Sequence, residues 1–227
     1  MQARREESAK QPRDLYELGT IHELRFERPQ ALAAYREAWE VGKNLDHGFK
    51  YAHFAQKLNR FNEALSTYEA LLNISTESQD RAATLNNLAM LYQDTQRLQK
   101  AEEAYGESLS IRRKLAEANP DAYLPDVAAT LNNLAYFYLS VESITEAETH
   151  ASEAERILHP LWQENPELHG NAMANILWTN ALVSEAGRNP ADEPCVLARR
   201  ALEAAHDATL KQSIQQLINR LCPEFVG

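Results

Sequence analysis

The eight residues AATLNNLA occur twice in this chain of 227 residues, at 82–89 and again at 128–135. Eight identical residues at one offset are not expected by chance. Each copy sets two leucines and three alanines around a pair of asparagines. Leucine and alanine favour helix, whereas asparagine is a mediocre helix former. The repeat therefore predicts a helix that the chain uses more than once, with asparagines kept for another purpose.

The octapeptide belongs to a longer frame in which one small residue follows another after 12 positions. Ala89 is followed by Ala101, and Ala135 is followed by Ala147. Two earlier segments keep the same spacing without the octapeptide. Their small residues are Gly19 with Ala31, and Ala52 with Ala64. The first member of each pair lies 33, 37 and 46 residues after the preceding one.

This frame resembles the tetratricopeptide repeat, whose consensus is W-x2-L-G-x2-Y, then A-x3-F, then P. The resemblance implies units of two antiparallel helices, here called A and B, in which small residues allow close approach and aromatics at 35, 68 and 105 fill the gap to the next unit. One unit cannot bury its apolar face alone, so units stack. We therefore expect an all-α fold, a right-handed α-solenoid of about five helix pairs.

The spacings of 37 and 46 residues are longer than the usual repeat of about 34 and suggest a subclass of this family. A long helix B, a loop interrupted by Asn119-Pro120 and Pro125, and then LNNLA resemble the kinesin light chain type of these repeats over residues 80–180. We expect a flexible N-terminal segment at 1–11, a repeat array at 12–207 and a capping helix with tail at 208–227. The fifth pair is degenerate, and its register stays open: Asn175 matches Asn132, or the unit is shifted by two or three residues.

Composition and charge argue against several kinds of protein, among them nucleic-acid-binding and membrane proteins. The net charge is −10, which disfavours binding to nucleic acid because phosphates repel an acidic chain. The sequence has no apolar run of the length that a membrane helix needs, and its N-terminus lacks the apolar core of a signal peptide. The two cysteines, 195 and 222, form no CxxC motif and suggest a reducing compartment with no disulfide framework. We expect a cytoplasmic protein.

The asparagine pairs step off the apolar stripe of their helices by about 100° and 200°. They therefore point away from the contact between helices A and B. An amide both donates and accepts hydrogen bonds, so it can hold the backbone of an extended peptide. The resemblance implies this role, in a concave groove lined by the A helices, for Asn86, Asn87, Asn132 and Asn133. The alternatives are that they cap, bridge neighbouring helices or face water.

Other residues on the same predicted face complete the candidate groove. Exposed methionine and aromatic side chains can anchor a partner, although they could equally be core residues between successive A helices. Lysine and histidine could form a local basic patch, or a solvated helix face. These further candidates are Met90, Gln93, Tyr136, Lys50, His53 and Asn175. A clamp for a C-terminal carboxylate is not present as a set, because the places it needs hold Arg13, Asp46, Ala83 and Ala129.

The sequence contains no motif of a known catalytic class, and we predict no catalytic residue, no metal site and no cofactor. The seven histidines form no HExxH and no zinc spacing with cysteine, and there is no Gly-rich phosphate loop. We predict a protein–protein interaction module with a protein or peptide ligand in the groove, no nucleic acid and no membrane. Three alternatives remain. The protein could be a self-assembling scaffold, which would make it a homo-oligomer. It could be a peptide-sensing regulator, or a domain of a larger signalling protein.

Overall fold

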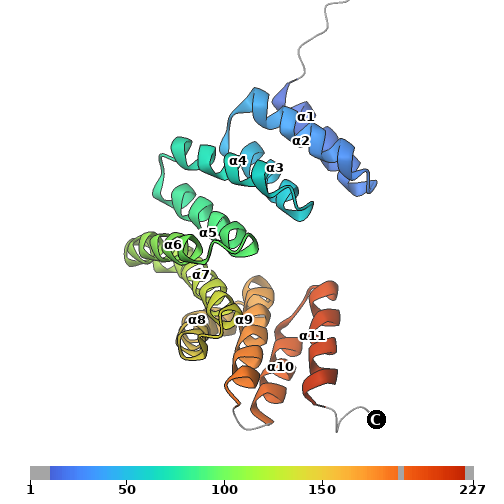
Figure 1. Ribbon diagram of the computed structural model, residues 1–227. Helices are drawn as coiled ribbons and strands as arrows, with labels where there is room; N and C mark the ends of the chain where they lie inside the picture. The colour runs from blue at the N-terminus through green and yellow to red at the C-terminus, as the bar shows by residue number, and fades with distance from the viewer. Residues whose placement is uncertain (1–10, 189–191, 223–227) are drawn as a thin grey trace, which may run out of the picture. The chain divides into compact units, whose positions relative to one another are not determined.

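The computed structural model describes residues 11–188 and 192–222, and these residues form helices joined by short turns with no strand. The all-α helical-repeat class expected from the sequence is confirmed. The eleven helices are α1 (Pro12–Leu24), α2 (Arg28–Gly42), α3 (Leu45–Lys57), α4 (Phe61–Ile74), α5 (Ser78–Asp94), α6 (Leu98–Ala118), α7 (Pro120–Ser140), α8 (Ile144–Glu164), α9 (Pro166–Ala186), α10 (Asp192–Ala204) and α11 (Ala208–Leu221). Figure 1 labels them in chain order.

The helices divide into two compact units, one ending at Arg97 and the other beginning at Leu98. The first contains α1 to α5 and the second contains α6 to α11. In the first unit α1 packs on α2 and α3 packs on α4. In the second, α7 packs on α8 and α9 packs on α10. Up to α10, the odd-numbered helices correspond to helix A of the repeat and the even-numbered ones to helix B.

Close packing in the first unit depends on a small residue in helix A. A Cβ atom added at Gly19 would lie 2.5 Å from Cε1 of Tyr35, so no larger residue fits there without moving the ring. Tyr35 and Tyr68 are both fully buried, as the frame predicts. Tyr35 also meets the ring of Phe54 on the next A helix, with centroids 5.3 Å apart. The aromatic residues therefore join successive helix pairs.

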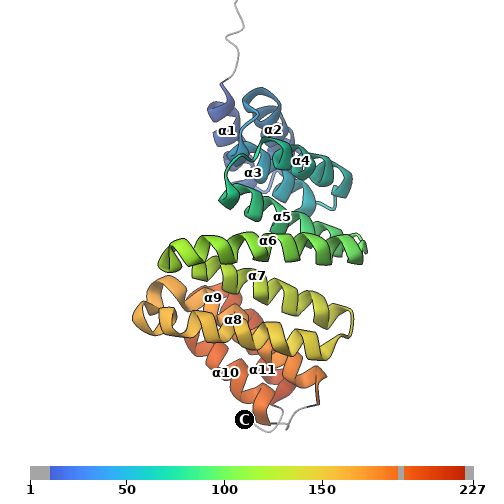
Figure 2. The same cartoon turned by 90° about the vertical axis from the view of Figure 1, so that its left-hand side faces the viewer.

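The second unit is built from longer helices. The helices α6, α7, α8 and α9 each have 21 residues, against 13 to 15 in α1 to α4. Figure 2 shows α6, α7 and α8 from the side. The predicted loop before LNNLA is wrong in one respect, because α7 starts at Pro120 and Pro125 lies inside it. Asp121 is exposed, so water can satisfy the carbonyl that Pro125 leaves without a donor.

A backbone signature marks the turn from helix A to helix B. One non-glycine residue adopts a positive φ there in all five pairs: Phe26, Asn59, Gln96, Glu142 and Arg188, with φ between 57° and 61°. Arg188 follows Glu142 by the same 46 residues that separate Glu142 from Gln96. The fifth small residue is thus the buried Ala181, and Trp178 takes the place of Asn132. Asn175 lies three residues earlier, so the shifted register holds.

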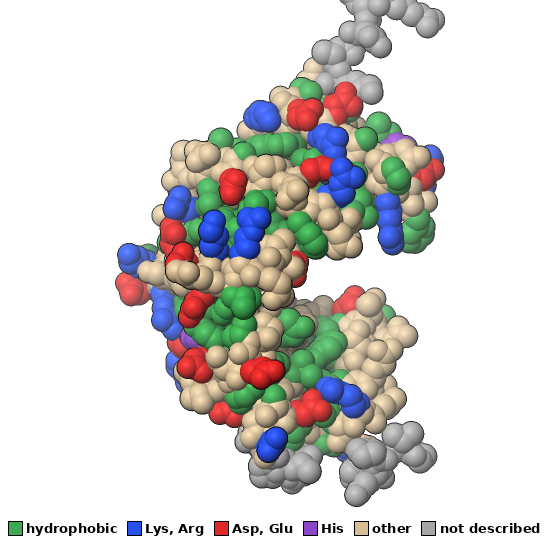
Figure 3. Space-filling view, in the orientation of Figure 1, with side chains coloured by type: hydrophobic (Ala, Val, Ile, Leu, Met, Phe, Trp, Pro, Cys, Tyr) green, Lys and Arg blue, Asp and Glu red, His purple; other side chains and the backbone are tan. Residues whose placement is uncertain are grey.

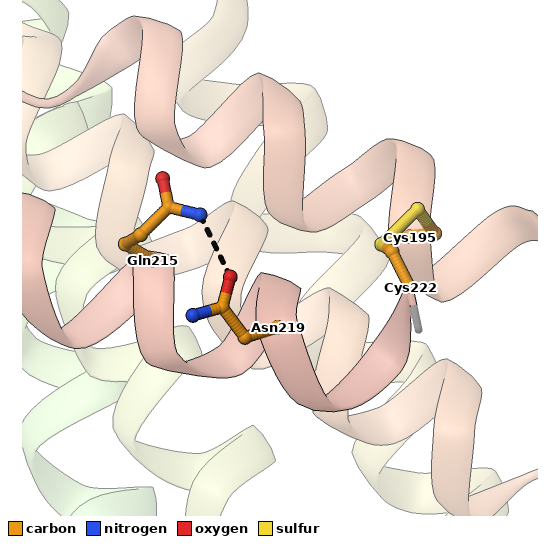
Figure 4. The surroundings of a disulfide bond; sticks show 4 residues. All are labelled: Cys195, Gln215, Asn219 and Cys222. Carbon is orange, nitrogen blue, oxygen red and sulfur yellow. Dashed lines mark hydrogen bonds between the residues drawn. A yellow bond between two sulfur atoms is a disulfide. The ribbon is translucent and has the colours of Figure 1, made fainter. Parts of the chain in front are cut away.

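The last helix, α11, covers the end of the array. Its buried residues Ile214, Leu217 and Ile218 recur at helical spacing. Asp207 caps its N-terminus, since Oδ1 accepts from the backbone N–H of Leu210 at 2.7 Å. The Gln215 side chain donates to Oδ1 of Asn219 on the outer surface at 3.0 Å (Figure 4). This helix is the capping helix that the amphipathic pattern predicts.

The two cysteines are paired, contrary to the prediction of separate thiols. Cys195 on α10 and Cys222 at the end of α11 form a disulfide with Cα atoms 5.7 Å apart (Figure 4). The prediction failed because the segment between them, with a sequence separation of 27, contains the turn that folds α11 back on α10. Disulfides persist mainly in oxidising surroundings. The expectation of a reducing compartment loses its basis, and a cytoplasmic location stays a prediction.

Candidate functional site

The predicted residues of the second unit lie on α7 and α9. Asn132 and Asn133 are half-buried, and Tyr136, one turn further along α7, is 53% exposed. The side-chain oxygen of Asn132 is buried and accepts no hydrogen bond, whereas Asn133 has an interaction within the protein. Asn175 on α9 is exposed. Helix α7 therefore holds one buried amide oxygen without a donor, close in sequence to an aromatic side chain that solvent reaches.

A buried cation that the sequence reasoning missed fixes the first half of α7. Arg112 of α6 is 8% exposed, and its Nη1 donates to the carbonyl oxygen of Asp126 at 2.8 Å and to Oγ1 of Thr130 at 2.7 Å. Burial lowers the pKa of Arg112, although Asp126 opposes this. The sequence did contain a sign of this buried charge. Arg112 lies at helical spacing between Leu109 and Ala116, which are both buried, and a charge on such an apolar stripe needs a partner. Arg112 thus positions the helix that carries Asn132.

The asparagines of the first unit are placed differently although their local sequence is the same. Asn86 on α5 is only 8% exposed and has an interaction within the protein. Asn87 and Gln93 are half-buried, and Gln93 is also engaged. Met90 is 40% exposed, which leaves it available to a partner. The two copies of the octapeptide are therefore not equivalent sites.

Lys50 and His53 on α3 do not form a set of free cations. The Lys50 ammonium lies 2.7 Å from Glu23 Oε2 and 4.9 Å from the ring centre of Tyr35. Burial is the largest single effect and lowers the pKa of Lys50, but the hydrogen bond to Glu23 and the attraction of Tyr35 and Glu23 together outweigh it, so the pKa is raised. Burial, with Lys57 and Lys50 nearby, lowers the pKa of His53. At neutral pH His53 is uncharged and the Lys50 charge is balanced.

A polar pocket of about 410 Å³ lies on α2, α3 and α4, and no predicted groove residue lines it. At its wall Arg36 Nε donates to the Tyr51 hydroxyl at 2.9 Å, and that hydroxyl donates to Oε2 of Glu63 at 2.6 Å. Arg36 Nη2 also donates to this carboxylate oxygen, at 2.5 Å, and Arg60 donates to Oε1. Two of the cations that line this pocket, Arg36 and Arg60, are therefore occupied by the protein's own carboxylate.

We found no cluster of three or more His, Cys, Asp or Glu residues that could hold a metal ion in the part of the chain that the structure describes. Within that same part, none of the helices combines the length and apolarity needed to span a bilayer.

The helical-repeat class can now be compared with known proteins. The profile of the tetratricopeptide repeat family matches residues 45–114, which is α3 to most of α6. Among curated protein sequences none matches this chain.

Several solved structures share the fold. BtubC (BKLC) from P. vanneervenii has a TM-score of 0.65 and 19% identity, over 91% of this chain and 80% of that one. A thermophilic TPR protein of Thermus thermophilus has a TM-score of 0.59 and 17% identity, over 91% and 98%. MamA protein has a TM-score of 0.55 and 15% identity, over 85% and 91%. At these identities the likeness concerns the fold alone.

Proposed function

We propose that this protein is a non-catalytic interaction module that binds an extended segment of a partner protein on the helix-A faces, above all on α7. The match to the tetratricopeptide repeat family supports an interaction role, because stacked helical repeats offer extended surfaces to other proteins. The finer proposal, a peptide held through its backbone and one or two side chains, rests on the residues of α7.

The observation that carries the proposal is the unpaired side-chain oxygen of Asn132. A buried acceptor without a donor costs about 1–3 kcal/mol. We propose that the side chain rotates to bring this oxygen, buried in the free protein, to the surface, where a partner's backbone N–H removes that cost. The amide would then hold a peptide whatever its side chains are, while the second amide group, that of Asn133, lies beside it on the same helix.

Tyr136 would supply the apolar anchor. It is 53% exposed and lies four residues after Asn132, so both side chains occupy adjoining turns of one face. A tyrosine ring provides a large contact area with little conformational freedom to lose, and its hydroxyl keeps a polar end. On α9, the exposed Asn175 and the half-buried Trp178 extend the same kind of surface.

The A-helix faces of the first unit, taken by themselves, offer fewer accessible side chains. Met90 offers a flexible apolar contact, and Asn87 is partly accessible. Asn86 is buried and already engaged, so we assign it a structural part in the free protein. The kinesin light chain type of repeat also remains a proposal, supported by the 21-residue helices that flank the second LNNLA segment.

A displayed peptide library selected on the full chain tests this function. Dissociation constants of the selected peptides are then measured by fluorescence anisotropy for four single variants. We expect Asn132→Ala to weaken binding by about 5–10-fold, the effect of one hydrogen bond, and Tyr136→Ala by about 10-fold or more. The controls are Asn62→Ala, an exposed asparagine of α4, and Val196→Ala, which is as exposed as Tyr136 at 53%. Binding that none of the four variants changes, or no selected peptide, would refute the proposal.

A further inference from the structure

The first helix, α1, has three faces, and two of them are covered by the protein itself. Leu15 and Gly19 are buried on the side that packs on α2. On the side of α3, the Tyr16 ring lies 5.4 Å from that of His47, and Glu23 binds Lys50. The third face carries Leu18 and Ile21, which are 37% and 45% exposed.

This third face is framed by one charge of each sign. Asp14 stands one turn before Leu18 and Arg25 one turn after Ile21, and both are exposed. At 100° per residue the four side chains fall within a strip about 60° wide. Neither Asp14 nor Arg25 takes part in an ion pair with another described residue. The name "α1 strip" is used below for Asp14, Leu18, Ile21 and Arg25.

The four residues of the α1 strip are placed symmetrically about one point of the helix, with the acid at one end and the base at the other. Leu18 and Ile21 are centred on the point between residues 19 and 20, and so are Asp14 and Arg25. Turning the helix by 180° about an axis through that point exchanges the two apolar residues and exchanges the acid with the base. The strip is therefore complementary to a second copy of itself laid antiparallel.

We propose that the α1 strip is a dimerisation surface, on which a second copy of the chain docks with a two-fold axis between residues 19 and 20. Leu18 packs on the partner's Ile21, and Asp14 pairs with the partner's Arg25, each contact occurring twice. A two-fold contact is closed, so it yields a dimer and not a filament. The proposal does not depend on peptide binding by α7.

Charge complementarity favours a second copy over other occupants. A head-to-tail neighbour would have to present α11, whose buried side is used and whose exposed residues include Lys211, Gln212, Gln215, Gln216 and Asn219. That surface has no apolar stripe to match the α1 strip. The chain's own residues 1–10, MQARREESAK, hold five charges and only Met1 as a large apolar side chain.

Further exposed apolar residues lie at the C-terminal end of the strip, while the exposed ion pair of Arg13 and Glu17 lies beside it. Leu24 and Phe26, at the end of the helix and in the following turn, are 75% and 85% exposed. Figure 3 shows hydrophobic side chains beside charged ones at the loop end of the α1–α2 pair. Contacts between single helices fall at the low end of interface sizes, so association should be weak, with a dissociation constant of about 10–100 µM.

Sedimentation equilibrium of the full chain over a range that spans this value is the first measurement. We expect a monomer–dimer equilibrium for the wild type and a monomer at all concentrations for Leu18→Gln/Ile21→Gln. Val41→Gln is the control, since Val41 is an exposed apolar residue of α2, and it should dimerise like the wild type. A wild type that stays monomeric, or a control that loses the dimer equally, would overturn the proposal.

A charge exchange tests the orientation. Asp14→Arg and Arg25→Asp, made singly, should each weaken the dimer about 10-fold because two like-charged contacts arise, and the double exchange should restore it. Circular dichroism verifies that each variant is folded. A double exchange no tighter than the singles would exclude the antiparallel pairing. If only a chain lacking residues 1–10 dimerised, the α1 strip would belong to that segment in the intact protein, and the proposal would be wrong.

Discussion

Cys195 and Cys222 are covalently joined, so the last helix is fastened to α10 at the point where α11 ends. The bond closes a loop with a sequence separation of 27, and such loops stabilise by about 2–4 kcal/mol because they restrict the unfolded chain. Reduction, or Cys222→Ser, should lower the free energy of unfolding of the second unit by this amount. Urea denaturation with and without dithiothreitol measures it.

Hydrogen exchange should locate the effect of reduction in α11, whose amides would lose protection before those of α7 and α8. The double variant Cys195→Ser/Cys222→Ser is the control and should not respond to dithiothreitol. A wild type whose stability is unchanged by reduction would show that the packing of Ile214, Leu217 and Ile218 holds the helix without the bond.

Glu63 should make the first unit sensitive to acid. The hydrogen bond from Tyr51 lowers the pKa of this carboxyl most, and Arg36 and Arg60 add to it against the effect of burial. The unfolded chain then binds a proton more readily than the folded one, so stability is complete above the ordinary glutamate pKa and falls as the pH drops through and below it. Glu63→Gln should cost about 1–2 kcal/mol at pH 7 and flatten this acid slope.

Urea midpoints of both proteins from pH 7 to pH 3 check this. Glu37→Gln, an exposed glutamate of α2, serves as the control. If Glu63→Gln and the wild type lost stability in parallel as the pH falls, the carboxylate would not be the group responsible.

Replacing Arg112 should be costly because its charge is buried and paired. Arg112→Ala removes the donors to Asp126 and Thr130 and leaves a cavity beside α7, so we expect a loss of about 2–4 kcal/mol in the free energy of unfolding. Lys114→Ala, an exposed basic residue of the same helix, should change it by less than about 0.5 kcal/mol. Equal effects of the two changes, measured by denaturation, would contradict the assigned role.

Glycine should be tolerated, or even favourable, at the A–B turns. Glu142 has a φ of 61°, a conformation that costs a side-chain-bearing residue about 1–2 kcal/mol. Glu142→Gly should therefore leave the melting temperature unchanged or raise it by a few degrees, despite the entropy of glycine. Glu146→Gly, four residues on in α8, should lower the free energy of unfolding by about 1 kcal/mol. Calorimetry distinguishes the two, and a loss at Glu142 as large as that at Glu146 would be incompatible with strain at the turn.

Much of the fold could be predicted because the buried small residues recur at a fixed spacing. Gly19, Ala52, Ala89 and Ala135 are all buried, and each stands seven residues before the residue with positive φ. A fifth pair was expected, but its register stayed open because its A–B connection is longer and Pro194 occupies a buried place on α10 where the other pairs have alanine. The register could have been predicted from Leu177 and Ala181, which follow Leu131 and Ala135 by 46 residues.

The candidate site could be predicted only in part, since local sequence does not fix exposure. Asn86 and Asn132 occupy identical octapeptides, yet one is buried and engaged while the other is half-buried with an unpaired oxygen. Neighbours distant in sequence decide that difference. The disulfide could not be predicted for the same reason, because the turn that precedes α11 is what brings its two cysteines together.

The five positive-φ turns have a practical consequence for anyone who wishes to insert a tag or a reporter. The stretch from the buried small residue of helix A to its turn has one length in all five pairs, so this part of the chain should resist insertion. The connections from helix B to the next helix A vary, and those at Asn119 and Asn165 lie between 21-residue helices. Both asparagines are exposed, and it is there that the chain should accept foreign sequence and still fold.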